Sequence, residues 1–374
     1  MKQTSRIIST CSADTFGVCS ALFELGGMVI MHDASGCNST YTTHDEPRWY
    51  DMDSMVYISG LREMEAILGD DEKLISDIAA AAEELRPKFI AIAGTPIPAM
   101  TGFDYDAVAN LIEERTGIPA FGFPTTGMET YVRGASMALG AIARRFVWEG
   151  EKTAEKSVNI LGLTPLDFSV NGSEDAIARR LEDNGWRVLS RWAMGSSLEE
   201  LSKAAGAHVN LVVSASGLEA AKVLKKRFGT PYVVGVPYGE KWSARLLRAL
   251  EAGEQNPVET LAGGEILLLG EGVSALSLAS ALEQALGTGV RVLSFTECPE
   301  GILRDKDLRC TSEEEIEAAI RRAKTVIADP MFAPIVPETV KFVSLPMESV
   351  SGRIYRTEIP NLVTEFETWL KEVM

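Results

Sequence analysis

Short apolar runs alternate along the chain with longer segments in which apolar residues recur every three or four positions. The segment that starts at Asp71 and ends before Pro87 shows the second pattern. Its Leu74, Ile78 and Leu85 fall on one face of a helix. The run FIAIA, residues 89–93, shows the first pattern and predicts a strand that is buried on both faces, as strands of parallel sheets are.

This alternation of strand and helix occurs in three blocks, separated by the polar segments 149–157 and 251–264. Such alternation indicates parallel sheets with helical crossovers. We therefore predict an α/β fold of three Rossmann-like parallel-sheet domains with helices on both faces. The predicted domains are residues 1–150, which carry three of the cysteines, 151–255, and 256–374, whose C-terminal helix packs back.

The predicted strands occur in all three blocks and are residues 28–31, 89–93, 120–123, 158–161, 187–190, 209–214, 232–235, 265–269, 291–296 and 325–328. Further helices are predicted at residues 105–114, 128–146, 174–184, 198–204, 218–228, 241–252, 274–286 and 312–323. In the tail, 361–374, Leu362, Phe366 and Trp369 share one helical face, which predicts that this helix is packed against a domain.

Composition and charge narrow the classes of protein. The 374 residues are 46% hydrophobic and 24% charged, which is typical of a folded chain with several cores, and the net charge of −17 disfavours binding to nucleic acid. Neither a signal peptide nor an apolar run of about 20 residues is seen, so we expect no membrane segment. Five cysteines without a regular spacing predict reduced thiols and a cytoplasmic protein.

Candidate chemistry concentrates in the stretch MHDASGCNSTYTTH, residues 31–44, and in the segment before it. Cys11, Cys19 and Cys37 all lie in the first 37 residues, and two of the three histidines, His32 and His44, lie in the stretch. Thiolates are the usual ligands of iron–sulfur clusters. The alternative is that these cysteines are small buried apolar residues, because no C-x-x-C pair is present.

A second motif is GEGVSA, residues 270–275, between an apolar run and a predicted helix. With Gly270 and Gly272 at the turn and Glu297 after the next strand, it resembles a dinucleotide-binding turn and suggests a nicotinamide-dependent oxidoreductase. The alternative is that the glycines serve only a tight turn. The chain has no G-x-x-x-x-G-K-[ST] sequence, so we do not expect it to hydrolyse ATP itself.

Several of these motifs together resemble the nitrogenase component 1 family, most closely its β-type subunit. The resemblance rests on Cys11, Cys19, the segment HDASGC at 32–37, the turn at 94–96 and the long segment 210–239. The chain departs from the family at three positions. Thr95 replaces the third N-terminal cysteine, Ser214 replaces the cysteine that holds the catalytic cofactor, and the cofactor-binding histidine falls near Pro346.

The resemblance implies three α/β domains and a reductive reaction other than dinitrogen reduction. It implies an iron–sulfur cluster, a [4Fe–4S] at a subunit interface, held by Cys11 and Cys37, with Cys19 or Asp14 as a third ligand. The interface would join two copies of the chain or the chain and a paralogous component 1 subunit.

The same resemblance implies an ATP-dependent iron–sulfur reductase as electron donor and a small-molecule substrate. The substrate pocket is expected between the three domains, near Tyr41, Thr95, Met128 and Tyr238. Two other hypotheses stay open at this point: a non-catalytic scaffold for cluster or cofactor assembly, and the nicotinamide enzyme.

Overall fold

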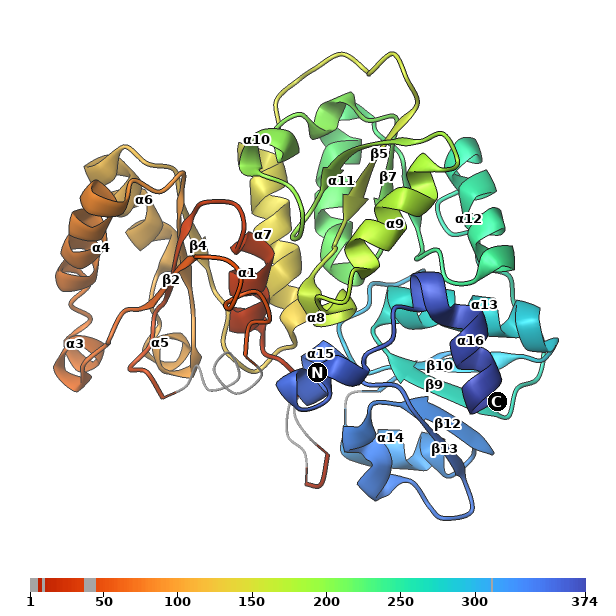
Figure 1. Cartoon of the computed structure of the whole chain (residues 1–374). Coiled ribbons are helices and arrows are strands. Elements are labelled where there is room, and N and C mark those ends of the chain that lie inside the picture. The colour runs from red at the N-terminus through yellow and green to blue at the C-terminus, as the bar shows by residue number, and fades with distance from the viewer. Residues whose placement is uncertain (1–5, 9–10, 37–44, 311) are drawn as a thin grey trace.

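The computed structural model describes residues 6–8, 11–36, 45–310 and 312–374. It contains three sheets whose strands are all parallel, each flanked by helices, as the sequence predicts (Figure 1). None of the helices in the described part of the chain is long and apolar enough to cross a membrane.

The first sheet has the order β2-β1-β3-β4, and its central strands β1 and β3 are buried on both faces. Its residues alternate between two cores. Val29 and Ala91 pack with α1 and α7, whereas Ile30 and Ile92 pack with α4 and α6 on the opposite face. The elements are β1 (Met28–Met31), β2 (Met55–Ile58), β3 (Ile90–Ala93), β4 (Ala120–Phe123), α1 (Asp14–Leu22), α3 (Glu63–Leu68), α4 (Glu72–Leu85), α5 (Pro96–Thr101), α6 (Tyr105–Thr116) and α7 (Tyr131–Arg145).

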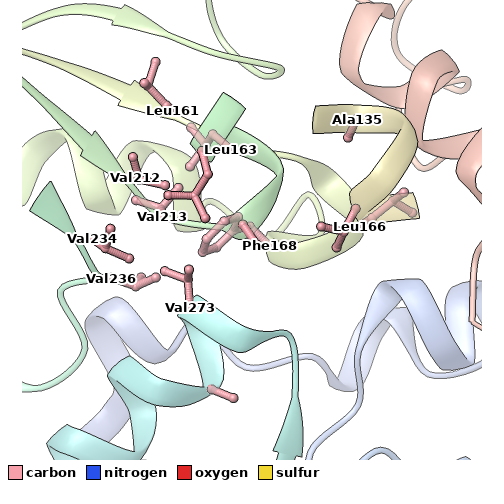
Figure 2. Packing of buried hydrophobic residues seen from close by; sticks show 14 of the residues in the cluster. Ala135, Leu161, Leu163, Leu166, Phe168, Val212, Val213, Val234, Val236 and Val273 are labelled. Carbon is pink, nitrogen blue, oxygen red and sulfur yellow. The ribbon is translucent and has the colours of Figure 1, made fainter. Parts of the chain in front are cut away.

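The second sheet has the order β6-β5-β7-β8. Figure 2 shows how apolar side chains such as Leu161, Val213 and Phe168 gather at one end of this sheet, beside Val273 of the third domain. The elements are β5 (Ser157–Leu161), β6 (Arg187–Arg191), β7 (Val209–Val212), β8 (Tyr232–Val234), α8 (Pro165–Phe168), α9 (Ser173–Glu182), α10 (Leu198–Leu201), α11 (Leu218–Phe228) and α12 (Glu240–Ala252).

The third sheet has the order β11-β10-β9-β12-β13. The C-terminal helix α16 leaves this domain and packs against α9 of the second one, where the Arg180 guanidinium donates to the Val363 carbonyl at 2.8 Å (Figure 1). The elements are β9 (Ile266–Gly270), β10 (Val290–Ser294), β11 (Leu308–Arg309), β12 (Thr325–Ala328), β13 (Lys341–Ser344), α13 (Gly272–Leu286), α14 (Glu313–Ile320), α15 (Glu348–Ser351) and α16 (Leu362–Val373).

Helices α1 and α7 approach each other unusually closely. A Cβ atom on Gly17 would lie 2.0 Å from the Tyr131 carbonyl oxygen, and one on Gly134 would lie 1.8 Å from the Asp14 carbonyl oxygen. The two glycines therefore let the helix backbones touch. Because α7 also packs against α11, it connects the first domain to the second and fixes the position of α1 between them.

Candidate functional site

Cys11 lies just before α1 and is only 3% exposed. The next residue, Ser12, is held at both of its backbone groups. Its N–H donates to the Ser349 carbonyl at 2.7 Å, and its carbonyl accepts from the Tyr131 N–H at 2.8 Å. Cys11 is thus fixed at the junction of α7 and α15. Cys37 and the rest of its stretch up to His44 lie outside the described residues.

Gly94 and Thr95 connect the segment before Cys37 with the start of α1. The Thr95 hydroxyl donates to the His32 carbonyl at 2.8 Å and bonds the Asp33 carboxylate at 3.0 Å. The Thr15 hydroxyl donates to the carbonyl of Gly94 beside it. The start of α1, the turn at 94–96 and the segment at His32 and Asp33 therefore meet where β1 and β3 end.

The two candidate third ligands have other contacts. Cys19 lies inside α1, fully buried in the apolar core, about 7 Å further along the helix axis than Asp14. The Asp14 carboxylate accepts from the Thr126 and Gly127 N–H groups, at 2.9 and 2.7 Å, and burial raises its pKa to about 6. Among the described residues, no three His, Cys, Asp or Glu side chains are placed to hold a metal ion.

The surroundings of these groups disfavour charge. Burial, and then the negative charge of Glu297, raise the pKa of the Cys11 thiol well above its usual range. Burial lowers the pKa of His32 to about 4, so this histidine is neutral at pH 7. Its ring packs against that of Phe103 in a tilted arrangement, with 4.4 Å between the centroids, and its Nδ1 bonds the Ser59 hydroxyl at 2.9 Å.

A cavity of about 70 Å³ lies where the three predicted domains meet, and the open space in front of it brings the total empty volume to about 650 Å³. Most of its wall is apolar, formed by side chains such as Leu268 and Leu345. Tyr238 lines it, as expected from the sequence, whereas Thr95 and Met128 do not; Tyr41 lies outside the described residues.

Two carboxylates from different domains face this cavity. Asp167 of α8 accepts hydrogen bonds from the hydroxyls of Tyr131 and Thr164. Glu271, 5% exposed, precedes α13 and accepts from the N–H groups of Val273 and Ser274, at 3.1 and 2.9 Å. Burial raises the pKa of both carboxyls, and the proximity of Asp167 raises that of Glu271 further.

Two of the three positions at which the chain departs from the resembling family lie at this cavity. Pro346 is part of its wall, and the Ser214 hydroxyl hydrogen-bonds Asp167. Sequence reasoning missed Asp167 and Tyr131. The available signal was weak: each lies at the start of a helix that follows a strand, where parallel α/β domains place functional groups.

The glycine motif at 270–275 has a different geometry from a dinucleotide site. The Glu271 carboxylate occupies the N-terminus of α13, where a pyrophosphate would lie. Glu297 accepts a hydrogen bond from the backbone N–H of Thr130 at 3.2 Å. Both observations speak against the nicotinamide hypothesis.

Three parallel-sheet domains that surround a cavity, with a buried cysteine beside it, define an α/β protein with an interdomain site. Residues 13–259 match the family model of nitrogenase component 1 type oxidoreductases. The chain therefore belongs to this family, which confirms the resemblance seen in the sequence; its likeness to the β-type subunit stays a prediction.

Individual relatives support the assignment. The chain is 30% identical over 188 residues to the nitrogenase iron-molybdenum cofactor biosynthesis protein NifE of Clostridium pasteurianum, which covers 49% of this chain and 40% of that protein. It is 28% identical over 197 residues to one of the subunits of the light-independent protochlorophyllide reductase of Nostoc punctiforme, covering 49% and 38%. The matched part thus spans less than half the length of these two relatives.

Among solved structures, nitrogenase Cp1 at pH 5 superimposes with a TM-score of 0.66 over the whole chain and 90% of its own length. The sequence identity is 15%, so this similarity shows the fold.

Proposed function

We propose that this chain is a component 1 type subunit that binds an iron–sulfur cluster next to a substrate cavity and serves a reductive reaction other than dinitrogen reduction. The observation that carries the proposal is the double backbone contact of Ser12. Its partners, Ser349 and Tyr131, both line the cavity, so Cys11 lies directly behind the cavity wall.

The donor set fits half of a [4Fe–4S] cluster. Thr95 does not fit as a ligand, because its hydroxyl is used in bonds to His32 and Asp33. Cys11 is a buried thiol in a negative environment, which the positive charge of iron would offset. With Cys37, and with Cys19 kept as a candidate third ligand, one chain supplies two or three thiolates. A second copy or a paralogous subunit supplies the others at an interface.

When bound, such a cluster supplies single electrons, which we propose come from an ATP-dependent iron–sulfur reductase in the cytoplasm. The residues of the chain itself hold a small-molecule substrate. The Tyr131 hydroxyl fixes the Asp167 carboxylate, and the α13 N-terminus fixes that of Glu271. Most of the wall around both carboxylates is apolar.

Anaerobic purification followed by iron analysis and EPR tests the cluster. We expect iron in the wild type and its loss in Cys11→Ala and Cys37→Ala. Cys310→Ala is the matched control, because Cys310 is also buried but lies in the third domain outside the proposed ligand set. Cys19→Ala decides whether the third ligand is real. A metal-free protein, unchanged by Cys37→Ala, would refute the proposal.

A second candidate is a non-catalytic scaffold for cluster or cofactor assembly. It is favoured by the similarity to a protein named for cofactor biosynthesis and by Ser214 at the place of a cofactor-holding cysteine. Incubation of the iron-loaded protein with the reductase and ATP separates the two candidates. Oxidation of the reductase coupled to conversion of a bound compound supports the oxidoreductase. Transfer of iron to an acceptor protein without turnover supports the scaffold.

A further inference from the structure

The wall of the cavity is mainly apolar but contains two acidic side chains. Asp167 comes from the second domain and Glu271 from the third, and both reach the same cavity. Among the described residues, no lysine or arginine forms an ion pair with either carboxylate. Two acidic groups therefore face a mainly apolar space with hydrogen bonds but without a counter-charge.

Each carboxylate is held in place by hydrogen-bond donors of the protein itself. Asp167 is fixed by the hydroxyls of Tyr131, Thr164 and Ser214. Glu271 is fixed by backbone N–H groups, including that of Ala215 at 3.0 Å. Such preorganised acceptors cost little to use when a ligand arrives, because their orientation is already set.

The rest of the wall indicates what the ligand has besides a positive charge. Leu166, Leu268, Leu278 and Leu345 form apolar walls, and Tyr238 lies among them with its hydroxyl bonded to Ser274. An apolar wall with a few fixed polar groups is typical of sites for small organic molecules. Burial and the proximity of Asp167 raise the pKa of Glu271 to about 8, so Asp167 carries most of the negative charge of the pair at pH 7. Phosphates, carboxylates and other anions are disfavoured, because they would be repelled by that charge in a medium of low dielectric constant.

We propose that the cavity binds a compact organic cation, an apolar molecule with a protonated amine or amidine nitrogen held between Asp167 and Glu271. The inference rests on the proposed function in one respect only, in that it takes this cavity as the substrate site. The cavity provides an apolar space for the body of the ligand, which neither carboxylate alone would indicate.

Three probes of nearly equal shape and different charge test this proposal: benzamidine as the cation, benzamide as the neutral analogue and benzoate as the anion. Binding to the purified full-length chain is measured by isothermal titration calorimetry. We expect benzamidine to bind roughly tenfold or more tightly than benzamide, and benzoate not to bind. Equal binding of benzamidine and benzamide overturns the proposal, and this comparison needs no variant.

Variants locate the site. Asp167→Asn and Glu271→Gln are each expected to weaken benzamidine binding roughly tenfold or more, whereas Glu338→Gln, a change at an exposed carboxylate, leaves it unchanged. Circular dichroism confirms that each variant is folded. Unchanged binding in both folded cavity variants refutes the proposal. So does binding of Mn²⁺, tested by the same titration, with displacement of benzamidine by the metal.

The test is independent of iron. A chain that holds iron at Cys11 but does not distinguish benzamidine from benzamide keeps the proposed function and loses this inference. A chain that binds benzamidine through Asp167 but contains no iron keeps the inference and loses the cluster.

Discussion

Replacing Gly17 by alanine tests the contact that positions Cys11. Glycine in a helix interior costs about 0.5–1 kcal/mol relative to alanine, so helix propensity alone predicts that Gly17→Ala stabilises the protein. The packing predicts the opposite. The new Cβ would lie 2.0 Å from the Tyr131 carbonyl oxygen and 2.9 Å from the Ala135 nitrogen, whereas real Cβ atoms do not approach closer than 3.0 Å.

The magnitudes decide between the two effects. Both neighbours are backbone atoms of α7, so α1 and α7 must separate by about 1 Å along their contact. Overpacking of this kind typically costs about 1–3 kcal/mol, and a rigid backbone neighbour places Gly17 at the upper end. After the gain in propensity, we expect Gly17→Ala to lower the free energy of unfolding by about 2 kcal/mol.

Gly140→Ala is the matched control, since Gly140 also lies inside a helix, α7. Its new Cβ would meet the side chain of Glu219, which is half exposed and able to turn away. The ion pair of Glu219 with Arg144 lies at the surface and is worth little. We expect Gly140→Ala to be neutral or slightly stabilising. Urea unfolding followed by circular dichroism measures both, and a Gly17→Ala protein as stable as Gly140→Ala would refute the reasoning.

Three further predictions concern charge and ligands. His32 has a folded-state pKa of about 4 against 6.5 in the unfolded chain, so its contribution, about 3 kcal/mol, is present above pH 6.5 and lost as the pH falls toward 4. His32→Gln should reduce this acid sensitivity in urea titrations, and identical pH profiles would contradict it. Arg304→Met should lower the free energy of unfolding by about 3–5 kcal/mol in the same assay, because Arg304 is buried with Asp307 and Glu283. The control Arg321→Met, at an exposed arginine, should leave the stability unchanged. Equal losses of stability in the two variants would rule out the buried ion pairs as the cause. NADH should show no saturable fluorescence change, because the Glu271 carboxylate occupies the α13 N-terminus; tight binding would restore the nicotinamide hypothesis.

The central strands could be predicted from sequence because they are continuous apolar runs. Residues 89–93 and 265–269 contain β3 and most of β9, both buried throughout. The edge strands β2, β11 and β13 were missed. In β11 and β13 polar residues interrupt the apolar run, whereas β2, with the sequence MVYI, is a short apolar run that only its pairing with β1 identifies as a strand. Their pairing depends on a neighbouring strand supplied from elsewhere in the chain.

Helix ends were predicted less well than helix positions. The predicted helix 128–146 begins at Tyr131, because Thr130 has an extended backbone and its N–H bonds Glu297, 167 residues away. The predicted helix 198–204 ends at Leu201, and a 3₁₀ turn over Ala204–Gly206 follows it. In the first case a distant side chain decides where the helix starts, and the local pattern carries no information about that contact.

Some residues of the candidate site could be proposed from the sequence and others could not. The cysteines near the N-terminus and Tyr238 were accessible from motif and resemblance. Asp167 was not, because its role depends on Tyr131 and Glu271, which come from other domains. Glu271 occupies the variable position of the glycine motif at 270–275, and the motif predicts no role for the side chain at that position. Sequence patterns identify the turns that carry Tyr131, Asp167 and Glu271, but only the tertiary structure shows that these three turns lie together.

Cys11 and the cavity are both positioned by the start of α7. Tyr131 is the first residue of α7; its hydroxyl holds Asp167, its N–H holds Ser12, and its carbonyl oxygen is the atom that the Gly17 contact approaches. A displacement of α7 by about 1 Å therefore changes the cavity wall and the position of Cys11 together. If Gly17→Ala folds, it should weaken iron retention and benzamidine binding in the same preparation, whereas Gly140→Ala should affect neither. Loss of one property without the other would show that α7 does not couple the two sites.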